Sequence, residues 1–208
     1  MKNFEIKNQN GRSMIEMLGV LAIIGVLSVG GIAGYSKAMM KYRINKTIEQ
    51  ITLIAGNVRK FFAPQKNYRN LSTNVIKKAK LVPDEMWNED KTALVNAFGD
   101  SFSIFGGSKN TATTSDDKAF IISLSGLPAE ACIELATHNW QIMDNVIAVV
   151  LANMDQFTQY GALDGCAGID DPTILAGCAN GITVGLPLPI EKVANVCETA
   201  DRLQIKFR

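Results

Sequence analysis

Histidine and cysteine are scarce in this chain, which has one histidine and four cysteines among its 208 residues. A zinc site of the Cys2His2 kind or a histidine-rich site therefore has almost no ligands to draw on. The lone His138 also makes a Ser-His-Asp triad a poor interpretation. No phosphate-binding loop or catalytic dyad stands out, so we predict neither an enzymatic activity nor a cofactor.

An excess of charge of one sign is missing as well. Lys and Arg total 21 and Asp and Glu total 20, which leaves a formal net charge of +1. This balance gives no general case for a nucleic-acid-binding surface, and we expect no nucleic-acid partner. Hydrophobic residues make up 47% of the chain, which argues against disorder. The length fits one domain with an appendage, or two very small domains.

Charge is absent altogether from the 20 residues between Met17 and Ser36. About 20 apolar residues in a helix span a hydrocarbon core of roughly 30 Å, so we expect a transmembrane segment at about 14–36. Three interpretations compete: a cleaved secretory signal, a signal anchor, and a segment cleaved ahead of its apolar run. The run exceeds the roughly 7–15 residues of a secretory signal, and hydropathy alone favours the anchor.

The residues ahead of the apolar run distinguish these interpretations. Glu16 lies one turn inside the hydrophobic stretch, where an unpaired carboxylate costs free energy and a plain anchor has no need of it. Gly11 precedes this glutamate by five positions, and an unbroken apolar run follows. A short polar leader, a glycine, this spacing to a glutamate and an apolar helix together resemble the type IV prepilin signature.

This resemblance implies that a membrane-embedded prepilin peptidase cleaves between Gly11 and Arg12, after which the new amino terminus is N-methylated. It also implies that Glu16 pairs with the amino terminus of a neighbouring subunit during assembly. A carboxylate at low dielectric seeks a cation, which agrees with that role. The alternative partner is Arg12 on the same helix, at i, i+4 spacing. Arg12 also departs from the Phe or Met usual at the first mature position of the family.

The helical pattern continues beyond the apolar run, and proline is absent before Pro64. A single helix from about Ser13 to Phe62 would hold about 50 residues and be about 75 Å long. Two helices joined near Gly34 and Tyr35 are the alternative. Apolar residues at alternating spacings of four and three form one stripe, which we expect to pack on a globular head. The stripe consists of Ile44, Ile48, Ile51, Ala55, Val58 and Phe62.

All four cysteines lie in the C-terminal half: Cys132, Cys166, Cys178 and Cys197. An even number beyond a membrane segment predicts two disulfides in an oxidising compartment. Four cysteines permit three pairings, and the spacing alone does not choose among them. The resemblance implies the pairs Cys132–Cys197 and Cys166–Cys178, because type IVb pilins join a middle helix to the C-terminal region by a disulfide. A four-thiolate metal site is a weak alternative, since no Cys-x-x-Cys motif occurs.

The remaining pattern predicts an α+β head with an antiparallel sheet. Strands are expected at 101–105, 119–125 and 202–207, helices at 128–143 and 189–199, and irregular structure at 155–185. Residues 145–152 form either a buried strand or a continuation of the preceding helix, and their β-branched content favours the strand. The resemblance covers residues 11–62, 128–135 and 193–207. It is strongest to type IVb pilins, the bundle-forming, toxin-coregulated and conjugative thin-pilus subunits. It implies the pilin fold, a long N-terminal helix, half transmembrane, packed on the sheet.

The expected organisation is therefore a leader at 1–11, a long helix at 12–62 and a disulfide-bonded head at 63–208. The resemblance implies a structural subunit that polymerises through its N-terminal helix into a surface filament, or fimbrium, for attachment, aggregation or conjugation. Implied partners are other copies of the chain, the prepilin peptidase, the inner-membrane assembly machinery and, before assembly, membrane lipid. The chain would first lie in the inner membrane with its head in the periplasm, and then in the extracellular pilus. The alternatives are a minor pilin or secretion-system pseudopilin, and an uncleaved membrane-anchored periplasmic binding protein.

Overall fold

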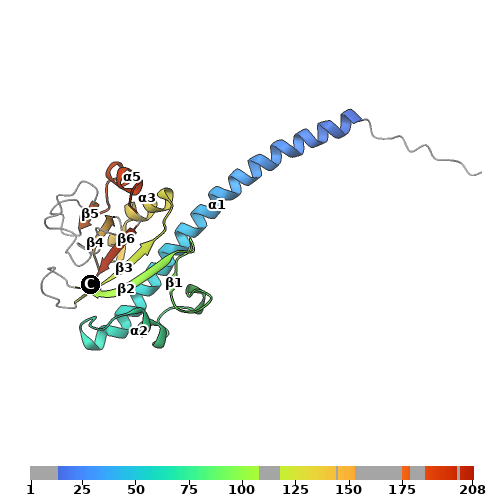
Figure 1. Cartoon of the computed structure of the whole chain (residues 1–208). Helices are drawn as coiled ribbons and strands as arrows, with labels where there is room; N and C mark the ends of the chain where they lie inside the picture. The colour runs from blue at the N-terminus through green and yellow to red at the C-terminus, as the bar shows by residue number, and fades with distance from the viewer. Residues whose placement is uncertain (1–13, 108–117, 144, 153–174, 179–185, 201) are drawn as a thin grey trace, which may run out of the picture. The chain divides into compact units, whose positions relative to one another are not determined.

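A computed structural model describes residues 14–107, 118–143, 145–152, 175–178, 186–200 and 202–208. The chain divides into two compact units, Met1–Tyr42 and Arg43–Arg208. Helix α1 runs as one element from Met14 to Phe62 (Figure 1). The expectation of a single helix is confirmed, and the alternative of two helices joined near Gly34 is wrong.

The composition of α1 explains both of its ends. Glu16 lies in its first turn, and Arg59 and Lys60 lie in its last turn. These charges complement the partial charges that the peptide dipoles leave at the two ends of a helix. After Phe62 the backbone continues as a short 3-10 helix, η1, at Ala63–Gln65, with Pro64 in its first positions. Proline lacks the N–H that the next α-helical bond requires, so the α-helix ends here.

The second unit contains a six-stranded sheet in the order β1-β2-β3-β6-β4-β5. All neighbouring strands are antiparallel. The strands are β1 at Leu94–Val95, β2 at Ser101–Gly107, β3 at Ala119–Ser125, β4 at Val146–Ala152, β5 at Leu175–Cys178 and β6 at Arg202–Phe207. The last strand in sequence, β6, therefore lies between β3 and β4, which ties the C-terminus into the middle of the sheet.

The core lies between this sheet and the second half of α1. In the central strands, Phe120 pairs with Phe207 and Ile122 pairs with Ile205, and all four are fully buried. On α1 the predicted stripe is buried except for Ile48, which is half-buried. The α+β fold with a long helix packed on an antiparallel sheet is thus as expected.

Among the described residues, the α-helices of the head are α2 at Thr73–Lys78, α3 at Ala129–Thr137 and α5 at Ile190–Cys197. The expected helix over 128–143 is wrong in its second half, because α3 ends at Thr137 and a 3-10 helix, η3, follows at Trp140–Met143. The buried Trp140 donates its indole N–H to the carbonyl of Leu135 at 2.8 Å. That carbonyl would be left without a partner at the helix end, so the chain turns back to satisfy it.

Three further elements, one helix and two strands, differ from the sequence-based expectation. Strand β5 lies within the range 155–185 that was expected to be irregular, and α2 and β1 lie in a stretch, 64–100, for which no element was predicted. Both strands are shorter than a period-two pattern needs to be recognised. Each is defined by its neighbour: Leu94 pairs with Phe102 in β2, and Leu175 pairs with Leu151 in β4.

Candidate functional site

The N-terminal part of α1 has an apolar surface with no covering in the single chain. Met14, Val26 and Val29 each expose more than two-thirds of their area, and the other large side chains up to Tyr35 are exposed as well. The helix is long and apolar enough to cross a membrane by length and composition. A continuous apolar surface of this size needs lipid or protein against it.

Glu16 is the acidic residue at the start of this surface, exposed in the first turn of α1. The next charged residue along the helix is Lys37, so for 20 positions the helix offers the carboxylate no cation. The processing residues Gly11 and Arg12 lie outside the described residues. The expected cleavage and N-methylation, and the alternative pairing of Glu16 with Arg12, stay predictions.

Several glycines lie within the apolar surface, although nothing in the single chain prevents a larger side chain at their positions. A Cβ atom built at Gly25, Gly30, Gly31 or Gly34 meets no other atom within 4 Å, apart from the helix's own nearby backbone. Each glycine costs up to about 1 kcal/mol in a helix interior relative to alanine. Small residues allow neighbouring helices to approach closely, so these positions suit packing against other helices.

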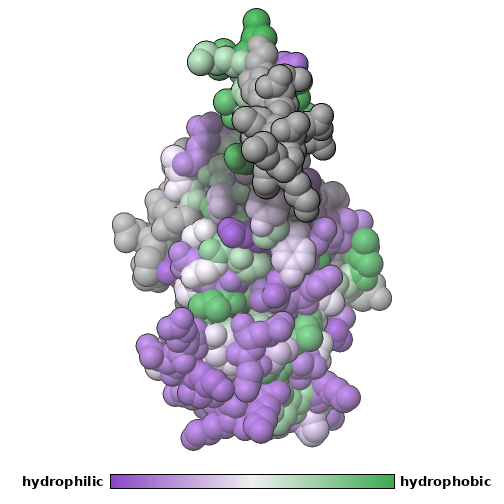
Figure 2. Space-filling view, turned by 90° about the vertical axis from the view of Figure 1, so that its right-hand side faces the viewer, coloured by the Kyte–Doolittle hydropathy of each residue, from purple (hydrophilic) through white to green (hydrophobic). Residues whose placement is uncertain are grey.

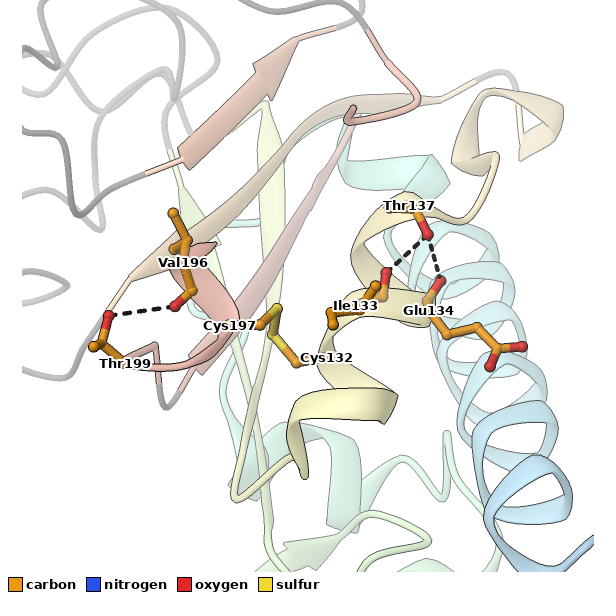
Figure 3. Close-up of a disulfide and its surroundings, with 7 residues drawn as sticks. All are labelled: Cys132, Ile133, Glu134, Thr137, Val196, Cys197 and Thr199. Carbon is orange, nitrogen blue, oxygen red and sulfur yellow. Dashed lines mark hydrogen bonds between the residues drawn. A yellow bond between two sulfur atoms is a disulfide. The ribbon is translucent and has the colours of Figure 1, made fainter. Parts of the chain in front are cut away.

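The disulfide Cys132–Cys197 joins α3 to α5 in the head, with 5.9 Å between the two Cα atoms (Figure 3). This is the pairing that the resemblance implies. Both cysteines are buried. The second expected pair, Cys166–Cys178, lies outside the described residues, because Cys166 and the side chain of Cys178 are not described.

Hydrogen bonds hold the helices on both sides of the disulfide. The Thr137 hydroxyl donates to the carbonyl of Ile133 at 2.8 Å, and the Thr199 hydroxyl donates to that of Val196 at 3.4 Å (Figure 3). The disulfide joins two cysteines that are 65 residues apart in the sequence. In the chain-entropy account a loop of that length stabilises the fold by about 4 kcal/mol.

A chain of aromatic rings, not foreseen from the sequence, connects the end of α1 to the sheet. Ring centroids are 5.8 Å apart for Phe62 and Tyr68, 4.8 Å for Tyr68 and Phe120, and 5.2 Å for Phe120 and Phe207. Burial raises the pKa of Tyr68, against the opposing effect of the charge and hydrogen bond of Arg59. These ring contacts hold the second half of α1 on the head. Their sequence signal is weak, because Tyr68 lies in an irregular segment.

Beside the same helix end lies an open pocket of about 440 Å³. Its lining consists of Asn57, Lys60, Phe61, Lys80 and Leu81. The Asn57 amide donates to the Leu81 carbonyl at 2.7 Å, which connects α1 to the segment after α2. Hydrophilic side chains cover much of this lower end of the head (Figure 2).

Comparison with known proteins identifies one family by its sequence model. The family model described as Bundlin matches residues 37–166, more than half of the chain. Among solved structures, the chain is similar to the crystal structure of TcpA, a type IV pilin from Vibrio cholerae El Tor biotype. That similarity has 17% sequence identity and a TM-score of 0.45, and covers 80% of this chain and 98% of the other. No curated protein sequence matches this chain.

Proposed function

This chain belongs to the Bundlin family of type IV pilins, and on that premise we propose that it is a structural subunit of a type IVb-like pilus. Pilins are structural subunits and not enzymes. The observation that carries the proposal is the exposed apolar surface of α1, which begins at Glu16 and includes no other charge up to Lys37. In the proposal this surface lies in the inner membrane before assembly and in the centre of the filament afterwards.

Processing precedes assembly in this proposal. Residues 1–11 form a leader that a prepilin peptidase removes between Gly11 and Arg12, and the new amino terminus is methylated. The mature subunit then comprises the helix at 12–62 and the head at 63–208. The inner-membrane assembly machinery extracts it from the membrane and adds it to the filament, where it serves attachment, aggregation or conjugation.

The carboxylate of Glu16 has an electrostatic role in the proposed assembly. In a low-dielectric surrounding an unpaired charge is costly, and a cation at the right depth compensates for it. The amino terminus of a neighbouring subunit would supply that cation. The Cys132–Cys197 disulfide supports a head that matures in an oxidising compartment, as the periplasm is.

A single substitution separates this function from that of an uncleaved anchored binding protein. In cells that assemble the pilus, Glu16→Ala should leave the amount of the chain in the membrane unchanged and remove it from the sheared surface fraction. The matched control is Glu49→Ala, which removes an exposed carboxylate from the second half of the same helix. It should assemble normally. Wild-type amounts of filament from Glu16→Ala would refute the docking role.

A further inference from the structure

The pocket beside the end of α1 combines basic and apolar side chains. Lys60 and Lys80 both belong to its lining, and among the described residues its lining includes no acidic residue. Phe61, also in the lining, exposes 43% of its area, and Leu81 is buried. The pocket therefore offers positive charge beside an apolar surface, which suits an acidic side chain next to an aliphatic one.

The local backbone explains why two lysines converge on this pocket. Lys60 lies in the last turn of α1. Lys80 follows α2 with a φ of 51°, and its backbone N–H donates to the carbonyl of Lys77. Lys77 itself points elsewhere, with Nζ 5.7 Å from the centroid of the Trp87 ring and bonded to the Lys91 carbonyl. Lys60 and Lys80 are thus the pair available to a ligand.

The matching side chains occur at the start of α5. Ile190, the first residue of the helix, exposes 64% of its area, and Glu191 beside it is exposed as well. The buried Val193 and the disulfide at Cys197 hold the helix on the head. The backbone N–H groups of Lys192 and Val193 both donate to the carbonyl of Pro189 at 3.1 Å, which closes the first turn. An aliphatic and an acidic side chain therefore project from a fixed turn.

The pocket and this turn lie at opposite edges of the sheet. Helix α2 packs near β2, whereas α5 packs near β4 and β5, at the other side of the strand order. Figure 1 shows α2 and α5 at opposite ends of the head. Two complementary surfaces at different places on one chain make a heterologous contact, and such a contact propagates into an open helical assembly unless the rotation closes a ring.

We propose that Ile190 and Glu191 of one copy dock into the pocket formed by Lys60, Phe61 and Lys80 of the next copy. The inference rests on the proposed filament function and names a contact between its heads. The Glu191 carboxylate lies near the two ammonium groups, and Ile190 covers the exposed ring of Phe61. A single exposed ion pair contributes little, so the strength comes from its combination with the apolar contact and from repetition along the filament.

Charge exchange in the full-length chain tests this contact in cells that assemble it. Glu191→Lys and Lys60→Glu should each reduce the sheared filament yield by about tenfold, since each places like charges at positions 60 and 191. The double variant should recover part of the yield, because it restores opposite charges at positions 60 and 191 while Lys80 then faces a like charge. The matched control is Glu198→Lys, an exposed glutamate just after the same helix, which should assemble as the unmodified chain does.

Three outcomes would overturn the contact: unchanged yields in both single variants, no recovery in the double variant, or an equal loss in Glu198→Lys. Equal amounts of each chain in the membrane show that folding is intact. A failure of the unmodified chain to reach the sheared fraction would instead contradict the proposed function, and the head contact with it. The two failures are thus distinguishable.

Cysteine cross-linking gives a readout that does not depend on yield. A chain with both Ile190→Cys and Phe61→Cys should form a ladder of covalent multimers when its sheared filaments are oxidised. Chains with either substitution alone should form no ladder, because a heterologous contact needs both partners. Filaments of the double variant that stay monomeric on a non-reducing gel would overturn the contact. If the pocket instead takes a small free anion, phosphate would protect Lys60 and Lys80 from acylation in the monomer, and no ladder would form.

Discussion

Gly126, directly after β3, occupies a position that requires glycine. Its backbone φ is +64°, a conformation that residues with a side chain rarely adopt. A Cβ atom added at this position would overlap the carboxylate of Asp100. That carboxylate accepts hydrogen bonds from the Ser101 N–H at 2.7 Å and from the Ser125 hydroxyl at 2.8 Å. These two bonds lower the pKa of Asp100. The glycine therefore allows a polar junction to form between β2 and β3.

Gly126→Ala should destabilise the head by about 1–3 kcal/mol, because backbone strain and displacement of Asp100 act together. The matched control is Gly99→Ala, where φ is +93° but no atom lies within 4 Å of the added Cβ. It should cost less, since only strain remains. Chemical denaturation of the purified full-length chains measures both. Equal losses in the two variants would contradict the role given to Asp100.

His138 determines a pH dependence of stability. Burial lowers its pKa in the folded chain, only partly offset by the charge of Glu134, and its ring packs edge-on to Trp140 at 4.7 Å. The unfolded chain therefore binds a proton at a higher pH than the folded one does. Stability should fall as the pH drops below about 6.5, the ordinary histidine value, towards the lower folded pKa.

His138→Gln should flatten this part of the stability profile, because it removes the titrating group. Urea unfolding of both chains between pH 8 and pH 5 measures the slopes. Parallel profiles for the variant and the unmodified chain would show that another group is responsible.

At the scale of elements, the sequence predicts well where periodicity is long or strict. Helix α1 has no proline and a continuous apolar stripe, and the strand β6 alternates residue by residue, so both were predicted within a residue. Helix α3 was predicted too long, because the bond from Trp140 to the Leu135 carbonyl that ends it has no signal in sequence spacing. Strand β5 depends on its pairing with β4, a contact that no local pattern encodes.

The Cys132–Cys197 disulfide holds α3 and α5 together. Cys132→Ser should destabilise the head by about 4 kcal/mol, since the unfolded chain regains the freedom of a long loop. Limited proteolysis of the membrane-bound chain should then cut near α5, which the disulfide holds on the head. Cys197→Ser should give the same pattern, because either substitution removes the same bond. Unchanged protease resistance in both variants would contradict a stabilising disulfide.

For the whole molecule, local sequence patterns predict the family and the assembling helix, but they do not predict the surface of the folded head. The resemblance implied the family from the residues around Gly11 and Glu16, and the match to residues 37–166 shows it from a largely different part of the chain. The pocket at Lys60 and Lys80 was not predictable, because α1 and the segment after α2 meet only through tertiary packing. Local patterns identify the helix that assembles, whereas a contact between heads emerges only from the folded surface.

Cleavage after Gly11 and assembly into a surface filament together define the proposed function of this chain. The most direct test is the intact mass of the chain sheared from native cells, before and after reduction. We expect a chain that lacks its first 11 residues and gains four hydrogens on reduction, two for each of two disulfides. A chain that stays in the membrane with Met1 to Gly11 attached would contradict it and indicate an anchored periplasmic protein.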